Sequence, residues 1–292
     1  MSHDTSPALT ALGIRITDGT QVTISGPDGV SASYAMPHWS GPPGPPTAIF
    51  MDLDGTTLRS EQFWIDILEA TARAAGGNDI RLRAEDRILL QGAPTRTHLA
   101  HIMRRYALDA SLTELAATYE QVCEALYFTR SIPALAAEIS LEPGFGEVRD
   151  WARRHDVPLI LVTNGNERKA GVGLEVIAHH LACASGSEVC DGVWCAPMRS
   201  SWLRPFGANA GKPHPWPYLE AATRGAQLDP TALRHAVAVD DSAAGVCSIR
   251  LAGIRSVGFA SGNIRGTGAH VFCDHIVDSL FGLLTLLDEL TA

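Results

Sequence analysis

Two pairs of carboxylates carry the strongest chemical signal in this sequence of 292 residues. The apolar run Ala48-Ile49-Phe50-Met51 leads directly into Asp52-Leu53-Asp54-Gly55, and a second apolar run leads into Asp240-Asp241. Carboxylates this close together repel one another and are costly to desolvate unless something uses them. One could act as a nucleophile, another as a general acid and base, and such hard oxygen ligands suit Mg²⁺. For the first pair, an Asp-rich turn that caps a helix is the alternative.

Two further segments could contact phosphate. Val162-Thr163-Asn164-Gly165 ends another apolar run, and a hydroxyl with exposed backbone N–H groups there can hold phosphate oxygens. An ordinary strand-to-helix turn explains that segment equally well. Gly211-Lys212-Pro213 places a lysine in a loop bounded by Pro and Gly, and the only other lysine is Lys169. The alternative for Lys212 is an ordinary solvated side chain.

The elements that must position these residues are parallel strands. Apolar runs predict strands over 48–51, 157–163 and 236–239, and helical segments separate them as in βαβ units. Ligands gather at the carboxyl ends of the strands in an open parallel sheet. We therefore expect an α/β fold with a Rossmann-like doubly wound parallel sheet, which brings all three acidic and hydroxyl segments to one edge.

A helical insert interrupts this core after its first strand. The positions Leu115, Tyr119, Val122 and Leu126 recur at helical spacing, and Ser111 with Glu114 forms a capping box. The predicted boundaries are residues 61–137 for the helical insert, and residues 47–60 with 138–292 for the α/β core.

Residues 1–46 form a separate N-terminal extension. Short β-prone runs at Gly13–Thr17, Gln21–Ser25 and Val30–Ala35 alternate with Asp-Gly pairs, which suit tight hairpin turns. The stiff Pro/Gly linker 41–46 then ends the pattern. We expect a small β-meander that either packs on the core or mediates a homodimer.

Together, these segments resemble the four motifs of the haloacid dehalogenase (HAD) superfamily: DxDGT, a Thr-Asn strand end, a Gly-Lys-Pro loop and an acidic DDSxxG. The resemblance runs from residue 47 to the C-terminus, and the segment Leu141–Gly144 is also similar. The helical insert resembles the small α-helical cap of the phosphatase and phosphoglucomutase-like branch.

The resemblance implies a role for each core residue. Asp52 would be the nucleophile that becomes an aspartyl-phosphate, while Asp54 would protonate the leaving oxygen and then activate water. Thr163 would bind phosphoryl oxygens, and Lys212 would neutralise charge. Asn164 and Gly165 would complete the phosphate site.

The same resemblance implies a magnesium ion. Asp52, the backbone carbonyl of Asp54 and Asp241 would hold it, and Asp240 would assist through water. A cation is physically reasonable here, because it reduces the repulsion between the negatively charged carboxylate and phosphate.

In the cap, the loop Gln91–Arg96 resembles one that such relatives dip into the active site. Arg96 could grip an anionic part of the substrate, and an exposed surface arginine is the alternative.

Single residues separate the reactions of this superfamily. True dehalogenases lack the second carboxylate, so Asp54 favours phosphoryl chemistry. Phosphonate-cleaving relatives need a cap lysine, and neither Lys169 nor Lys212 lies in the insert. Mutases usually carry a histidine twelve residues after the nucleophile, where this chain has Trp64. We therefore expect a Mg²⁺-dependent phosphatase acting on a small phosphorylated metabolite. The alternatives are a sugar-phosphate mutase and a non-catalytic binding protein.

Composition excludes several other functions. The chain has 32 acidic and 23 basic residues and a net charge of -9, which argues against nucleic acid as a partner. The sequence contains no run of ~18 apolar residues, so no membrane-spanning helix is expected. Residues 1–10 contain no basic cluster and no apolar region, so no secretory signal is expected. Six cysteines are too few for a disulfide framework in this length, and we expect a cytoplasmic location.

Two features stay open at this level. The spacing of His180, Cys183, Cys190 and Cys195 matches no common zinc site. The segment 189–209 is longer than the usual link in the family, and its aromatic residues could be core, an oligomer contact or a lid. Those residues are Trp194, Trp202 and Phe206.

Overall fold

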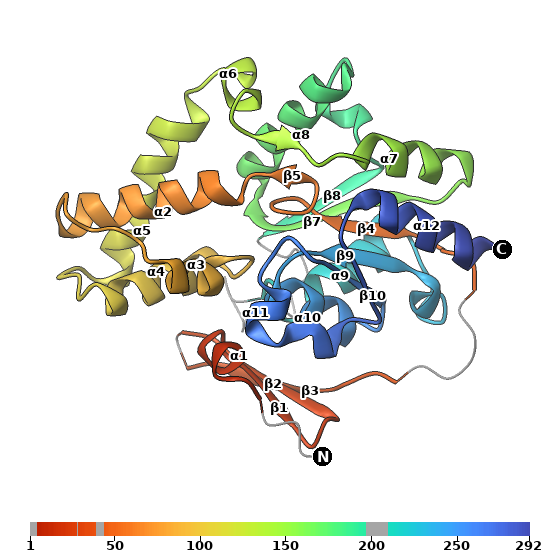
Figure 1. Ribbon diagram of the computed structural model, residues 1–292, viewed down its shortest axis with the longest axis horizontal. Coiled ribbons are helices and arrows are strands. Elements are labelled where there is room, and N and C mark those ends of the chain that lie inside the picture. The colour runs from red at the N-terminus through yellow and green to blue at the C-terminus, as the bar shows by residue number, and fades with distance from the viewer. Residues whose placement is uncertain (1–4, 28, 39–43, 197–209) are drawn as a thin grey trace.

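A six-stranded parallel sheet forms the centre of the molecule (Figure 1). The structure, a computed structural model, describes residues 5–27, 29–38, 44–196 and 210–292. The strand order is β11-β10-β9-β4-β7-β8, so the chain winds outward in both directions from β4. This arrangement confirms the expected doubly wound α/β core. The strands are β4 (Ile49–Asp52), β7 (Leu159–Asn166), β8 (Gly192–Ala196), β9 (Val237–Asp240), β10 (Arg255–Phe259) and β11 (His275–Val277).

Helices cover both faces of this sheet, which explains why its central strands are apolar throughout. Ile49 and Met51 of β4 pack with residues of α7, α8 and α12, whereas Phe50 packs with residues of α9 and α10 on the opposite face. All four residues of β4 are buried, as expected for a parallel strand covered on both sides. These helices are α7 (Phe145–Arg154), α8 (Glu167–Leu181), α12 (Leu280–Thr291), α9 (Trp216–Glu220) and α10 (Ala243–Leu251).

Shorter elements complete the core. Within the described ranges, no helix combines the length and the apolar character that crossing a membrane requires. The short elements are α11 (Ile264–Thr267), η2 (Gly186–Glu188), η4 (Ala221–Gly225), η5 (Leu233–His235) and η6 (Ala269–Phe272).

A helical layer lies beside the sheet, on the left in Figure 1, and has an apolar core of its own that includes Leu68, Leu99 and Leu115. It leaves the sheet after β5 (Leu58–Arg59) and returns at β6 (Ser140–Leu141), and these two short strands pair antiparallel to form its neck. We call this layer the cap. Its helices are α2 (Glu61–Gly76), α3 (Ala84–Leu90), α4 (Thr95–Arg105), α5 (Leu112–Cys123), η1 (Glu124–Phe128) and α6 (Ile132–Ala136).

The helix α5 begins with the expected capping box, in which Ser111 and Glu114 each accept a hydrogen bond from the other's backbone N–H. One of its expected apolar positions differs from the pattern. Leu126 is exposed, whereas Tyr127 is buried, because the chain passes into the π-helical turn η1. A π turn contains an extra residue and shifts the buried face.

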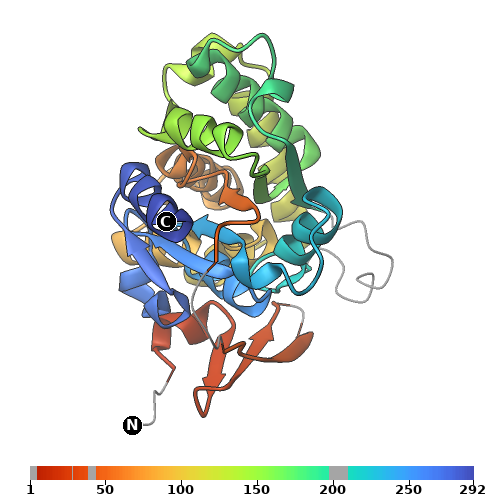
Figure 2. The same ribbon diagram turned by 90° about the vertical axis from the view of Figure 1, so that its right-hand side faces the viewer.

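The N-terminal extension packs on the core at the bottom of Figures 1 and 2. Its strands form the antiparallel sheet β1-β2-β3, and the short helix α1 (Pro7–Ala11) precedes them. Ile14 and Val22 share an apolar cluster with Val246 of α10 and with Phe272. The tip of β3 also reaches the loop after Lys212, where the hydroxyl of Tyr34 lies 2.7 Å from Nδ1 of His214. The strands are β1 (Ile14–Thr17), β2 (Gln21–Ser25) and β3 (Ser31–Ala35).

A buried carboxylate joins two helices of the cap. Asp86 of α3 is 1% exposed and accepts hydrogen bonds from the Tyr106 hydroxyl at 2.5 Å and from Nε of Arg105 at 3.1 Å. The backbone N–H of Arg83 donates at 3.1 Å, and Nε2 of His101 lies at the same distance. Burial alone would raise the pKa of Asp86, but these partners together hold it below its ordinary value.

We predict that Asp86→Asn lowers the free energy of unfolding by about 2–3 kcal/mol at pH 7, because the amide cannot satisfy the same donors. Since the folded pKa is depressed, this contribution is present above the ordinary value of 3.8 and is lost as the pH falls below it. Urea unfolding at several pH values measures the difference. The exposed Asp66→Asn serves as the control and should change stability by less than about 0.5 kcal/mol. Equal effects of the two substitutions would contradict this account.

Candidate active site

Three strands bring acidic and hydroxyl side chains to one edge of the sheet. In the central register, Asp52 pairs with Val162 of β7, and Met51 pairs with Val239 of β9. Asp52, Thr163 and Asp240 therefore emerge next to one another where their strands end. One carboxylate oxygen each from Asp52, Asp240 and Asp241 lies within 4.8 Å of the others. The apolar strands thus collect polar groups that were separated by almost two hundred residues of sequence.

Lys212 lies at the centre of this cluster and is 1% exposed. Its Nζ is 2.5 Å from Oδ1 of Asp52 and 2.7 Å from Oδ2 of Asp240, and it donates to the carbonyl of Val162 at 2.8 Å. Burial would lower the pKa of Lys212, but Asp240 and Asp52 together raise it above its ordinary value. The lysine is therefore a buried cation that two carboxylates share, and not the solvated side chain of the alternative interpretation.

Asp240 has its hydrogen-bonding capacity occupied. Its Oδ2 accepts from Lys212 and from the Tyr218 hydroxyl at 2.9 Å, and its Oδ1 accepts from the Ser242 backbone at 2.9 Å and hydroxyl at 2.7 Å. A Cβ on Gly245 would come within 1.8 Å of the Asp240 carboxyl carbon, so the glycine of this motif leaves room for that carboxylate. These contacts favour a positioning role for Asp240.

Asp241 has the opposite surroundings. It is 2% exposed, and no described residue donates a hydrogen bond or forms an ion pair with its carboxylate. Burial raises the pKa of Asp241 well above its ordinary value, and the nearby acids Glu61, Asp240 and Asp52 raise it further. Gly55 has φ +86°, and a Cβ there would lie 2.3 Å from Oδ2 of Asp241. The glycine thus leaves room for a buried carboxylate that no described cation neutralises.

These features fit a divalent cation. Asp52 also has a raised pKa, because burial and the neighbouring acids outweigh Lys212. A hard cation between Asp52 and Asp241 would supply the missing positive charge, and carboxylate oxygens are the ligands that Mg²⁺ prefers. Within the described residues, these acids form the one group of three or more potential metal ligands. The possible zinc ligands around His180 do not come together, and the His180 ring itself bonds to the Ile139 carbonyl at 2.8 Å.

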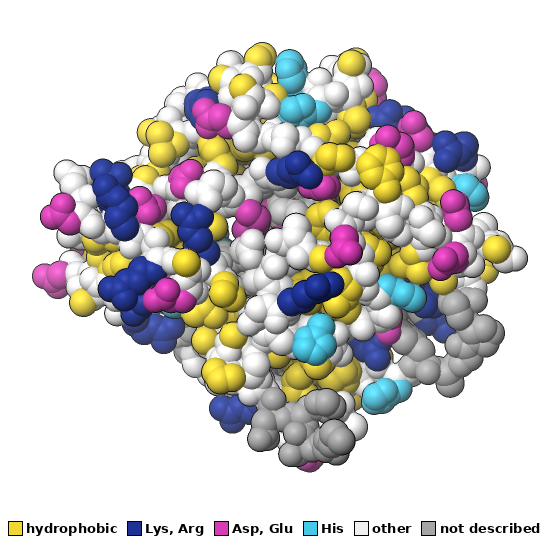
Figure 3. Space-filling view, in the orientation of Figure 1, with side chains coloured by type: hydrophobic (Ala, Val, Ile, Leu, Met, Phe, Trp, Pro, Cys, Tyr) yellow, Lys and Arg dark blue, Asp and Glu magenta, His cyan; other side chains and the backbone are white. Residues whose placement is uncertain are grey.

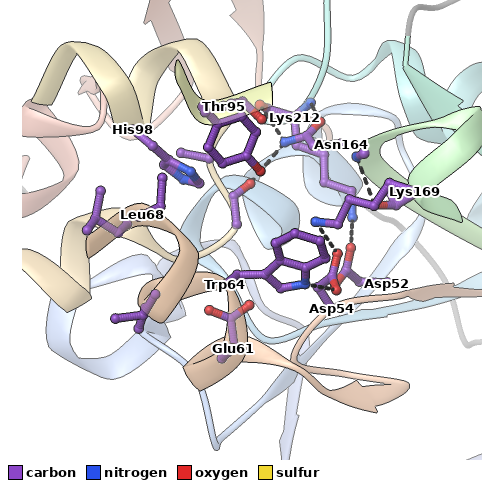
Figure 4. A pocket seen from close by; sticks show the side chains of 17 residues that line it. Asp52, Asp54, Glu61, Trp64, Leu68, Thr95, His98, Asn164, Lys169 and Lys212 are labelled. Carbon is purple, nitrogen blue, oxygen red and sulfur yellow. Dashed lines mark hydrogen bonds and ion pairs between the residues drawn. The ribbon is translucent and has the colours of Figure 1, made fainter. Parts of the chain in front are cut away.

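Asp54 lies beside the cluster and has its own partners (Figure 4). Ser60 Oγ and Trp64 Nε1 each donate to its Oδ1 at 2.6 Å, and Nζ of Lys169 lies 2.9 Å from its Oδ2. Burial raises the pKa of Asp54, but Lys169 and the hydrogen bonds outweigh burial and lower it. The ammonium group of Lys169 also lies 3.5 Å from the centre of the Trp64 ring, within the range of a cation–π contact.

Sequence reasoning missed Lys169 as a site residue because it considered Lys169 only as a possible lysine of the helical insert. A usable signal was present in its position, six residues after Thr163. β7 ends at Asn166 and α8 starts at Glu167, so the first turn of α8 must begin at the same sheet edge as the carboxylates. Glu61, the first residue of α2, also lines the cavity and was not expected.

The expected phosphate-binding residues differ in their contacts. Thr163 is 2% exposed and lines the cavity, and its Oγ1 accepts from the Gly165 backbone at 3.0 Å. The Asn164 side chain accepts from the Lys212 backbone at 2.8 Å and donates to the carbonyl of Gly92 in the cap at 2.9 Å. Asn164 therefore connects the cap to the loop that contains Lys212. Both its amide oxygen and its amide nitrogen already form hydrogen bonds to the backbone.

The cavity between core and cap encloses about 60 Å³. The cap wall is mainly apolar, with Ile65, Leu68 and Leu90, and also carries Thr95 and His98. Arg96 is exposed and does not line this cavity, so the geometry gives no support to its expected grip on the substrate. In the long 189–209 segment, Trp194 packs against the core, while Trp202 and Phe206 lie outside the described residues.

The fold and this site define a class of protein: an α/β protein whose parallel sheet carries an acidic cluster at one edge, beneath a helical cap. The sequence model of the haloacid dehalogenase-like hydrolases matches residues 46–253. The chain belongs to this family, and the resemblance inferred from the four motifs is confirmed. No curated protein matches the chain.

Solved structures agree with this fold. A hydrolase from Pseudomonas syringae has a TM-score of 0.62 at 18% identity and covers 84% of this chain and 100% of its own. A β-phosphoglucomutase from Clostridium difficile has a TM-score of 0.60 at 17% identity, and the match covers 84% of this chain and 98% of the mutase. CbbY from Rhodobacter sphaeroides, in complex with phosphate, has a TM-score of 0.60 at 23% identity, and the match covers 83% of this chain and 99% of CbbY. At these identities, the similarity shows the fold alone.

Proposed function

We propose that the enzyme is a Mg²⁺-dependent phosphatase that hydrolyses a small phosphate monoester through an aspartyl-phosphate on Asp52. The observation that carries this proposal is the pairing of Asp52 with a buried Lys212, next to the unneutralised Asp241. This arrangement gives a carboxylate nucleophile whose charge, and that of an approaching phosphoryl group, is balanced by cations. Phosphoryl transfer depends mainly on such positioning and charge neutralisation.

The second carboxylate is suited to proton transfer. Ser60 and Trp64 both donate to Oδ1 of Asp54, whereas Oδ2 has one described partner, Nζ of Lys169 at 2.9 Å. Oδ2 is therefore the oxygen with more capacity to exchange a proton with the leaving group. We assign Asp54 to protonate the leaving oxygen and then to take a proton from the attacking water. Thr163, which lies in β7 and lines the cavity, would donate its hydroxyl to a phosphoryl oxygen.

Asp52, Asp241 and the backbone carbonyl of Asp54 would hold the magnesium ion, and Asp240 would assist through water. When bound, the ion would neutralise the phosphoryl oxygens and lower the repulsion between phosphate and carboxylate. Asp240, with its four donors, fixes the orientation of Lys212.

Hydrolysis is favoured over a mutase reaction by Trp64. Its indole N–H is fixed on Asp54, and the ring is 9% exposed. An indole donates a hydrogen bond but does not exchange protons as an imidazole does. A sugar-phosphate mutase is the second candidate, because one of the structures with this fold is a β-phosphoglucomutase. A non-catalytic binding protein is disfavoured by the retained carboxylate cluster.

The proposed location is the cytoplasm. None of the six cysteines forms a disulfide in the described part of the chain, which supports a reducing compartment.

We predict Mg²⁺-dependent release of phosphate from a generic aryl phosphate, and loss of that release in EDTA. A hydrolase needs only water, whereas a mutase depends on a bisphosphate activator. The same assay with and without a sugar bisphosphate separates the two reactions. Mg²⁺ should also raise the melting temperature, because it binds a buried acidic cluster in the folded state only. Turnover that is unaffected by EDTA would contradict the proposal, and turnover that requires the bisphosphate would favour the mutase.

A further inference from the structure

The two halves of the active-site cavity differ in chemistry. On the core side, the lining contains the charged residues Asp52, Asp54, Lys169 and Lys212, and Glu61 lies close to them. On the cap side, to which Glu61 of α2 belongs, the rest of the wall is apolar and interrupted by uncharged polar side chains, which are Trp64, Thr95, His98 and Tyr119. A phosphoryl group on Asp52 would therefore have its leaving group directed toward an uncharged surface.

His98 of α4 is a cap residue that lines the cavity and has an unmet hydrogen-bonding need. Its Nε2 is buried and has no hydrogen-bond partner among the residues that the structure describes. Figure 4 shows His98 at one end of the cavity and Asp52 at the other. Burial, together with the positive charge of Lys169, lowers the pKa of His98 to about 3, so the ring is neutral at pH 7. An unpaired buried polar atom costs about 1–3 kcal/mol, which a suitable ligand group would recover.

The charges around the cavity restrict what that group can be. Of the cations that line it in the described residues, Lys212 is paired with Asp52 and Asp240, and Lys169 is paired with Asp54. A second phosphate or a carboxylate on the leaving group would thus be buried against Leu68 and Leu90 without a free cation. Burial of an unpaired charge is strongly unfavourable.

A hydroxyl group can form the hydrogen bond that His98 lacks, and burying it costs much less free energy than burying an unpaired charge. It both donates and accepts, so it can bond to Nε2 whichever ring nitrogen carries the proton. A carboxylate only accepts, and it would need an N–H at that atom as well as a compensating charge. The apolar wall beside His98 suits the carbon atoms that carry the hydroxyl.

We propose that the substrate is the phosphate monoester of a small neutral alcohol with at least one further hydroxyl, and that His98 determines specificity by bonding to that hydroxyl. This inference rests on the proposed phosphatase function. It assigns recognition of the leaving group to the inner face of α4, and it leaves the exposed Arg96 without a part in substrate binding.

Three phosphate esters with the same three-carbon chain test the inference. Glycerol 3-phosphate carries hydroxyls, propyl phosphate carries none, and 3-phosphoglycerate adds a carboxylate. With Mg²⁺ present, kcat/KM should be about 10-fold or more higher for glycerol 3-phosphate than for propyl phosphate. 3-Phosphoglycerate should be the poorest of the three.

Variants then identify the residue responsible. His98→Leu should reduce the ratio between glycerol 3-phosphate and propyl phosphate to near one, through a fall in kcat/KM for glycerol 3-phosphate. His98→Gln, which keeps a hydrogen-bonding group, should restore part of the preference. His101→Leu is the matched control, since His101 lies on the same helix but bonds to Asp86 outside the cavity. This control should keep the wild-type ratio, whereas a merely structural loss would lower all three rates together.

The outcomes separate this inference from the function on which it rests. Preference for 3-phosphoglycerate, or a ratio that survives in His98→Leu, would overturn the inference alone. Turnover of an aryl phosphate but of none of the three esters would do the same. If Mg²⁺ supports hydrolysis of no phosphate ester at all, the proposed function fails, and this inference fails with it.

Discussion

Asp52→Asn is expected to lower kcat by about 10⁴-fold or more, because an amide cannot attack phosphorus and the other carboxylate beside Lys212, that of Asp240, already accepts four hydrogen bonds. The protein should still fold. Burial and neighbouring acids raise the pKa of Asp52, so the charge of this side chain opposes folding, and removing it should leave the melting temperature unchanged or higher. Phosphate release and a thermal melt of the same preparation measure both effects.

The thermal melt is the internal control for this experiment. A loss of activity with an unchanged melt assigns the effect to chemistry. Turnover within about 10-fold of the wild type would contradict the role of Asp52.

Lys212→Met should affect both stability and activity. Lys212 is 1% exposed, and its removal leaves Asp52 and Asp240 facing each other without their shared cation. We expect the free energy of unfolding to fall by about 3–5 kcal/mol at pH 7, as for other buried charges that lose a partner. Acidification should relieve part of this loss, because protonation removes the repulsion. Turnover should fall by about 10³-fold, and denaturant unfolding with a phosphate assay measures both quantities.

Lys169→Met is the matched control for that substitution. Lys169 has a more exposed side chain and pairs with one carboxylate, Asp54, which keeps Ser60 and Trp64 as donors. Its loss should cost about 1 kcal/mol of stability. A Lys212→Met protein as stable as the Lys169→Met protein would contradict the shared-cation arrangement.

The sheet and its acidic edge could be predicted from sequence for a simple physical reason. Strands that are buried on both faces must be apolar at every position, so β4 and β9 are recognisable as continuous runs. A carboxylate at the end of such a run is costly, which makes Asp52 and Asp240 conspicuous. The N-terminal strands were also recognisable, because Asp18 and Gly19 adopt the positive φ angles that their hairpin turn requires.

Other parts of the site depend on packing that no local pattern contains. Lys169 lies in an amphipathic helix and resembles a surface lysine until α8 is placed against Asp54 and Trp64. His98 is recognisable as a candidate only when the cap and core close around it and its Nε2 is found without a partner. Conversely, Arg96 follows a suggestive loop in the sequence, but the direction of the first turn of α4 leaves it exposed.

The central claim is that Asp52 itself attacks phosphorus and carries the phosphoryl group before water removes it. Rapid-quench turnover of a phosphate ester with a radiolabelled phosphoryl group tests this claim most directly. We predict a transient covalent label that hydroxylamine removes, that maps to the peptide containing Asp52, and that is absent in Asp52→Asn and without Mg²⁺. A label on another residue, or phosphate release by an Asp52→Asn protein at the wild-type rate, would contradict it.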